Sequence, residues 1–172
     1  MNFTKIDMQN SRILTQSILR VAVIDLLLTA AACFIPTASH LLALPLYMLN
    51  PMLALLLAGM LLGRDWRGAL VLALLMPLVS SIVTGMPSTG KMFCMMAELA
   101  TVASLGSHLL KRWNPMPAIL VAILVGKVVY YAAKAAIVAP TVLLETQWYV
   151  QAFPVLLWAG LFSILYRKSV NQ

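Results

Sequence analysis

Charged residues are scarce in this sequence, and acids are fewer than bases. Lysine, arginine, aspartate and glutamate make up 10% of the 172 residues, whereas 62% of the residues are hydrophobic. A soluble domain usually carries about 25% charged residues, because polar side chains must cover its surface. The deficit excludes an ordinary water-soluble globular fold. A lipid bilayer is the solvent that suits this composition, so we expect an integral membrane protein.

The sequence also lacks the residue patterns of enzymes and metal proteins. Cys33 and Cys94 lie in apolar runs with no metal-ligand spacing around them, and we interpret them as small core residues. His40 and His108 are predicted on opposite sides of the membrane, so they cannot share a metal ion. The sequence has no nucleotide-binding loop, and no serine–histidine or paired-aspartate constellation. We therefore predict neither an enzyme nor a protein that holds a metal or another cofactor.

Six apolar runs predict six membrane-spanning helices. A span across about 30 Å of hydrocarbon needs roughly 20 helical residues. The second run contains Pro45 and Pro51, which predict a kinked helix or a re-entrant piece. We expect an all-α membrane protein that folds as a compact bundle of six transmembrane helices; a count of five stays open if one short run is only interfacial. The predicted spans cover residues 13–34, 41–62, 69–83, 92–110, 116–138 and 150–166 of a single domain, residues 1–172.

The distribution of positive charge predicts the orientation of the chain. The formal net charge is +7, and the basic residues form short clusters between the apolar runs rather than a nucleic-acid-binding arm. With six spans, Lys91 alone falls on one side and nine basic residues fall on the other. The positive-inside rule then places both termini in the cytoplasm, with the chain in a plasma or inner membrane. The nine residues are Lys5, Arg12, Arg20, Arg64, Arg67, Lys111, Arg112, Arg167 and Lys168.

Four ionisable residues well inside the predicted spans stand out, because charge is costly there and each such residue is a candidate functional residue. They are Asp25, Glu98, Lys127 and Lys134. Helical spacing puts Lys127, Tyr131 and Lys134 on one face of the fifth span. Two interpretations stay open at this point. The acids and lysines either form ion pairs that only stabilise the bundle, or they contact a substrate.

The predicted outer connections are rich in proline, glycine, serine and threonine. The loop Gly85–Lys91, with the sequence GMPSTGK, is either an ordinary turn or a lid over an outward-facing cavity. Trp148 and Gln151 lie at the outer start of the sixth span, where they line that cavity unless Trp148 belongs to an interfacial aromatic belt. The candidate substrate-binding residues are Met86, Pro87, Lys91, Glu98, Lys127, Tyr131, Lys134, Trp148 and Gln151.

Several short motifs, spread over about two-thirds of the chain, match one family of membrane proteins. They are Pro51, the Gly59–Gly68 turn, Pro77, Gly85-Met86-Pro87, Met96-Ala97-Glu98-Leu99, Gly126-Lys127-Val128-Val129-Tyr130, and Gln151 with Pro154. In these motifs the chain resembles the substrate-binding S components of energy-coupling factor (ECF) transporters. Lys127 stands where relatives commonly have arginine, which keeps the charge but loses bidentate recognition.

The resemblance implies a six-helix protein that binds a vitamin or related micronutrient in a pocket open to the outside. It also implies partners: a transmembrane coupling subunit and two ATPase subunits, which complete an ATP-driven importer. The rival prediction is a structural or scaffolding subunit of a membrane-envelope complex with no small-molecule substrate. A water-filled outward pocket of several hundred cubic ångströms favours binding. A close-packed bundle with its acids and lysines paired favours the scaffold.

Overall fold

A computed structural model describes residues 19–35, 41, 49–62, 66–85, 87–137 and 148–170, with the side chains of the last range described from 152 to 169. The described residues form six helices and are otherwise turns and short connections. A helix over residues 19–35 comes first. It is followed by α2 (Pro51–Leu61), α3 (Trp66–Thr84), α4 (Thr89–Leu109), α5 (Pro115–Ile137) and α6 (Trp148–Val170). The all-helical fold class predicted from the sequence is confirmed.

Three of these helices, α3, α4 and α5, are long and apolar enough to cross a membrane. The 21 residues of α4 correspond to about 31 Å of helix, which matches the hydrocarbon thickness of a bilayer. Because three consecutive helices have this length and composition, the chain is a membrane protein. The count of six spans and the cytoplasmic position of both termini stay predictions.

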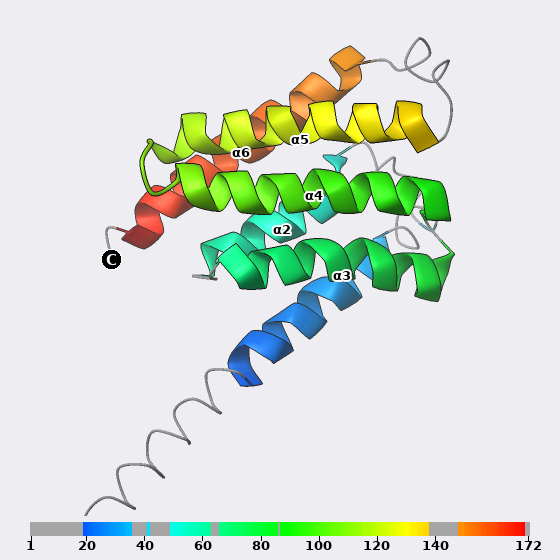
Figure 1. Cartoon of the computed structure of the whole chain (residues 1–172). Helices are drawn as coiled ribbons and strands as arrows, with labels where there is room; N and C mark the ends of the chain where they lie inside the picture. Colours follow the sequence, from blue (N-terminus) through cyan, green and yellow to red (C-terminus); the bar gives the residue numbers. More distant parts are fainter. Residues whose placement is uncertain are drawn as a thin grey trace, which may run out of the picture.

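The three long helices lie side by side, with α4 in the middle (Figure 1). The short helix α2 packs against α3, α4 and α6, and α6 also packs against α5. The helix over residues 19–35 crosses obliquely beside α3, and its first turns project away from the other helices (Figure 1). Only its later part joins the core, where Ala32 is buried. Helix α4 is therefore the central element of the bundle.

The bundle is apolar on its outside as well as in its core. Leu53, Leu72 and Ile123 are fully buried between helices, as a soluble protein would have them. Yet Ile82 is 74% exposed and Val128 is 68% exposed. Exposed apolar surface on this scale is typical of a protein whose outer face meets lipid. Polar side chains, by contrast, are found inside: Thr29, Ser80, Glu98 and Ser163 are all buried.

Helix α2 begins much later than the apolar run that contains it. The sequence predicts a kinked or re-entrant segment over residues 41–62, whereas α2 covers only 11 residues from Pro51. Asn50 has φ 48° and ψ 64°, a left-handed conformation that asparagine adopts more readily than most residues. Pro51 then occupies the first helical position, where its missing N–H costs nothing. Residues 42–48, which include Pro45, lie outside the described residues.

The connection between α3 and α4 is shorter than the seven-residue loop predicted from the sequence. Gly85 ends α3 with φ 69°, a conformation that favours glycine. Helix α4 already begins at Thr89, so Lys91 belongs to its first turn rather than to a loop. The Ser81 hydroxyl donates a hydrogen bond of 2.9 Å to the Pro87 carbonyl and ties the turn to α3. The described part of this connection is thus short and is fastened to the end of α3.

Candidate functional site

An ion pair joins the two central helices. The Lys127 Nζ atom on α5 lies 2.8 Å from Glu98 Oε1 on α4. The Lys127 side chain is 14% exposed and that of Glu98 is 4% exposed. Ions this deep in a membrane bundle are costly unless they are paired. The pairing of Glu98 with Lys127, one of the two interpretations of the sequence, is therefore present in the structure.

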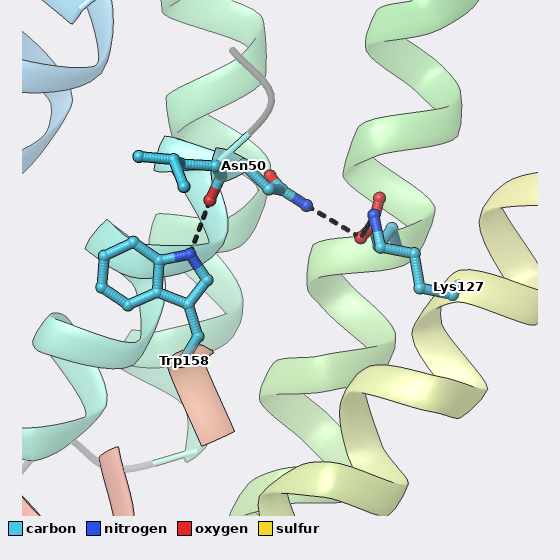
Figure 2. A network of polar contacts seen from close by, with 5 residues as sticks. Asn50, Lys127 and Trp158 are labelled. Atoms are coloured by element: carbon cyan, nitrogen blue, oxygen red, sulfur yellow. Dashed lines mark hydrogen bonds and ion pairs between the residues drawn. The ribbon is translucent and has the colours of Figure 1, made fainter. Parts of the chain in front are cut away.

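Asn50 makes the second contact to the same carboxylate oxygen. Its side-chain amide donates a hydrogen bond of 3.2 Å to Glu98 Oε1. The neighbouring residue, Leu49, accepts a hydrogen bond through its carbonyl oxygen from the indole N–H of Trp158 (Figure 2). Leu49 and Asn50, directly before α2, thus link the α4–α5 ion pair to Trp158 of α6. We call Asn50, Glu98, Lys127 and Trp158 the polar network.

Two members of the polar network were missed by the sequence analysis. Asn50 is not among the predicted candidates, because it is neutral and precedes an apolar helix. Its signal in the sequence is the dipeptide Asn50-Pro51, which marks a turn and the start of a helix. Trp158 lies ten residues into α6, where a tryptophan in an apolar run resembles an ordinary lipid-facing or interfacial residue, yet it is half-buried. Its contact with Leu49 spans 109 positions of the sequence, so no local pattern predicts it.

Gly126 brings the two helices close enough to form the ion pair. A Cβ atom at this position would lie 2.7 Å from Val102 Cγ2 and 3.2 Å from the carbonyl oxygen of Glu98. Both distances are below normal van der Waals contact, so only glycine fits without a shift of α4 or α5. Because Gly126 precedes Lys127, the close approach occurs at the level where the lysine must reach Glu98.

The face of α5 beyond the ion pair is also polar. The hydroxyl oxygen of Tyr131 is buried and has no hydrogen-bond partner in the described part of the chain. The rings of Tyr130 and Tyr131 meet edge to face with centroids 5.3 Å apart, and Lys127 Nζ lies 5.5 Å from the Tyr130 centroid. Lys134 lies two turns further along α5 from Lys127 and is half-buried. This face therefore offers a hydroxyl and an ammonium group that the ion pair does not use.

The other candidate residues predicted from the sequence do not belong to the polar network. Lys91 is exposed in the first turn of α4, about 10 Å along the helix from Glu98. Pro87 lies in the turn before α4, where its carbonyl accepts the bond from Ser81. Met86 lies outside the described residues. Trp148 and Gln151 are placed in the first turn of α6, but their side chains lie outside the described part.

A shallow groove of 580 Å³ lies elsewhere on α4 and α5. No member of the polar network lines it, and its position nearer to the far end of α4 separates it from Tyr131 and Lys134. Among the described residues no group of histidine, cysteine and acidic side chains could hold a metal ion. The groove is lined by Ala100, Thr101, Ser104, Leu105, His108 and Val125.

No family model matches the chain, and neither a curated protein nor a solved structure is significantly similar to it. The class of the protein therefore follows from its helices and its interior. It is an all-helical membrane protein with a buried ion pair between its two central helices.

Proposed function

We propose that this chain is the substrate-binding S component of an ECF-type ATP-driven importer. In this function it binds a vitamin or related micronutrient from outside the cell and delivers it inward. The proposal includes six spans with both termini in the cytoplasm of a plasma or inner membrane. It also includes a transmembrane coupling subunit and two ATPase subunits as partners, and it assigns no enzymatic activity to the chain itself.

The observation that carries the proposal is the polar face of α5. Its Tyr131 hydroxyl is buried without a hydrogen-bond partner among the described residues, next to a lysine that pairs with Glu98. A buried hydroxyl without a partner costs free energy, about 1 to 3 kcal/mol, unless something outside the chain satisfies it. A small molecule with polar groups supplies that partner. The motifs shared with ECF S components point to the same use of this helix.

The rival function is a scaffolding subunit of a membrane-envelope complex. The closed Glu98–Lys127 pair favours it, because a pair whose charges balance needs no ligand. Asn50 adds to this argument, since its amide donates to the same oxygen and leaves the network self-contained. The two functions differ in what they expect of Tyr131. A scaffold leaves its hydroxyl unused, whereas a binding protein uses it.

Mass spectrometry of small molecules that co-purify with the full chain tests the proposal. We expect a bound compound in the wild-type protein, reduced about fivefold to tenfold in Tyr131→Phe, which removes one hydroxyl and little else. Tyr166→Phe is the matched control, because Tyr166 lies on α6 rather than α5 and its ring stacks on Phe162. A protein without any bound compound would favour the scaffold, whereas equal amounts in all three forms would show that the Tyr131 hydroxyl does not hold the compound.

A further inference from the structure

The shallow groove on α4 and α5 follows one half of the length of α4. It begins at Ala100, the twelfth of the 21 residues of α4, and it reaches His108 in the last turn. The rise along the helix between these two residues is about 12 Å. Val125, which α5 contributes, lies near the middle of that helix. Since half of a hydrocarbon core is about 15 Å thick, the groove extends through about the depth of one leaflet.

The polar groups of the groove gather toward the end of α4. Deeper in the groove, the Thr101 hydroxyl donates a hydrogen bond of 2.7 Å to the Ala97 carbonyl, so its polar group is satisfied within the helix. Ser104 and His108, which lie nearer the end, are exposed. Polar groups that face hydrocarbon are costly unless they find a partner. The occupant that suits this groove is therefore apolar in its deep part and accepts hydrogen bonds near His108.

The turn after α4 continues the same face of the helix. The backbone N–H of Lys111 donates a hydrogen bond of 3.3 Å to the His108 carbonyl. Residues joined by such a three-residue bond lie above one another, so Lys111 follows His108 along the helix axis. The spacing of Ser104, His108 and Lys111 also places all three on one helix face. The groove thus leads directly to a lysine.

This end of the groove is positively charged and lies at the level of lipid headgroups. Lys111 and Arg112 are both exposed, and Trp113 in the same turn is 50% exposed. Basic residues and tryptophan that flank a span are typical of the membrane–water interface. The sequence has no acidic residue between Glu98 and Glu145, so no acid next to this turn offsets its charge.

We infer that this groove binds one anionic phospholipid. One acyl chain lies along the groove, the phosphate contacts Lys111 and Arg112, and His108 donates a hydrogen bond to the phosphate or to an ester oxygen. Basic sites between membrane helices bind anionic headgroups in this way. A helix of another protein would fill the apolar part of the groove, but it would leave the basic end without negative charge. The lipid site goes beyond the proposed function, because it lies apart from the polar network.

Native mass spectrometry of the full chain tests the headgroup contact. The protein is released from nanodiscs that hold equal amounts of phosphatidylglycerol and phosphatidylcholine with the same acyl chains, and the retained lipids are counted. We expect at least about tenfold more phosphatidylglycerol than phosphatidylcholine, and the double variant Lys111→Gln with Arg112→Gln should remove most of this preference. Arg167→Gln with Lys168→Gln is the matched control, because it removes two adjacent exposed basic residues of α6 that do not belong to the groove.

A second pair of variants tests the acyl chain. Ser104→Leu places a larger apolar side chain in the groove and leaves every charge intact. We expect it to lower the retained phosphatidylglycerol about fivefold, because it displaces part of the chain. Ala132→Leu adds a similar side chain on the exposed face of α5 outside the groove, so it should leave lipid retention unchanged.

Each contrary result overturns the lipid site. Equal retention of the two lipids shows that no anionic headgroup is bound. Equal losses in the α4 and α6 double variants show a general attraction of basic residues to anionic lipid. Full retention in Ser104→Leu shows that no acyl chain lies in the groove. If Ser104→Leu instead releases a co-purifying protein subunit and keeps the lipid, the groove belongs to a partner helix. Unchanged thermal unfolding midpoints show that none of these losses is a loss of folding.

Discussion

At the scale of single residues, one carboxylate oxygen of Glu98 holds two polar groups inside this bundle. Glu98 Oε1 receives the ammonium group of Lys127 and the amide of Asn50, which come from different helices or helix ends. Burial makes each contact worth more than it would be in water, and it makes a missing partner expensive. The stability of this part of the bundle therefore depends on Glu98 and Lys127 both being present rather than on either charge alone.

We expect Glu98→Gln to lower the free energy of unfolding by about 3 kcal/mol, because it leaves Lys127 buried without a counter-charge. Adding Lys127→Met to this variant should return the stability to within about 1 kcal/mol of the wild type, since a neutral pair of similar size replaces the ions. Glutamine keeps an acceptor for Asn50, so that hydrogen bond survives in both variants. Thermal unfolding of the two single variants and the double variant completes the cycle.

Additive effects in that cycle would contradict the proposed coupling of Glu98 and Lys127. If the double variant is as unstable as the sum of the singles, the two side chains do not stabilise each other. Trp158→Phe is a useful comparison, because it removes one hydrogen bond from the same network without leaving a buried charge. Its cost should be only about 1 kcal/mol.

The two charged members of the polar network could be predicted from the sequence, and the two neutral members could not. Glu98 and Lys127 stand out because ionisable residues are rare in apolar runs, so their importance was predictable from the sequence alone. Whether they pair or contact a ligand was not predictable, since it depends on how close α4 and α5 come. Asn50 and Trp158 contribute through hydrogen bonds to residues 48 and 109 positions away. Only the folded arrangement reveals such contacts.

At the scale of helices, α4 and α5 approach each other closely because Gly126 has no side chain. Gly126→Ala places a methyl group 2.7 Å from Val102 Cγ2, and a branched valine side chain has little freedom to move away. We expect a loss of about 1 to 3 kcal/mol in unfolding free energy, as for other overpacked interiors. The separation of α4 from α5 should also weaken the Glu98–Lys127 pair. Thermal unfolding in detergent measures the first effect.

Gly160→Ala is the matched control for this prediction. A Cβ atom at Gly160 on α6 would have no neighbour within 4 Å in the described part of the chain. The same glycine-to-alanine change should therefore leave stability unchanged or raise it slightly, because alanine favours helix. Equal effects at Gly126 and Gly160 would show that helix propensity, and not the close approach of α4 and α5, explains the result.

The turn between α3 and α4 is the second feature that belongs to this scale. We expect Ser81→Ala to free the turn, because it removes the hydrogen bond to the Pro87 carbonyl. A loss of about 1 kcal/mol corresponds to roughly fivefold faster local opening. Hydrogen–deuterium exchange of the peptide at the start of α4 measures this opening. Thr101→Val removes a hydroxyl that bonds only within α4, so it should leave exchange at the turn unchanged.

The helix boundaries show what a hydrophobicity pattern can and cannot predict. The apolar runs predicted helices at the positions of α3, α4 and α5, because the long spans leave little choice of conformation in lipid. The start of α2 depended instead on Asn50, whose left-handed backbone interrupts an otherwise apolar run. The start of α4 came earlier than predicted, since polar residues such as Ser88 and Thr89 belong equally well to a loop or to a first helical turn.

At the scale of the whole molecule, the composition predicted a lipid environment but not the direction in which the helices cross the membrane. An apolar exterior around a buried Glu98 is what a lipid-embedded bundle needs, and the scarcity of charge predicted it directly. The direction of each span depends on the few basic residues that flank it. Lys111 and Arg112 are exposed in the turn that follows α4, while Ser88 is exposed just before α4 begins. These two turns therefore decide the orientation of the central helix.

Cysteine labelling at the two ends of α4 tests that orientation. In a background with Cys33→Ala and Cys94→Ala, we expect a membrane-impermeant maleimide to label Ser88→Cys in intact cells. Lys111→Cys should react only after the cells are opened, because about 31 Å of helix separates the two sites. Labelling of both sites from outside would show that α4 does not span the membrane. The reversed pattern would place the start of α4 in the cytoplasm and contradict the orientation predicted from the basic residues.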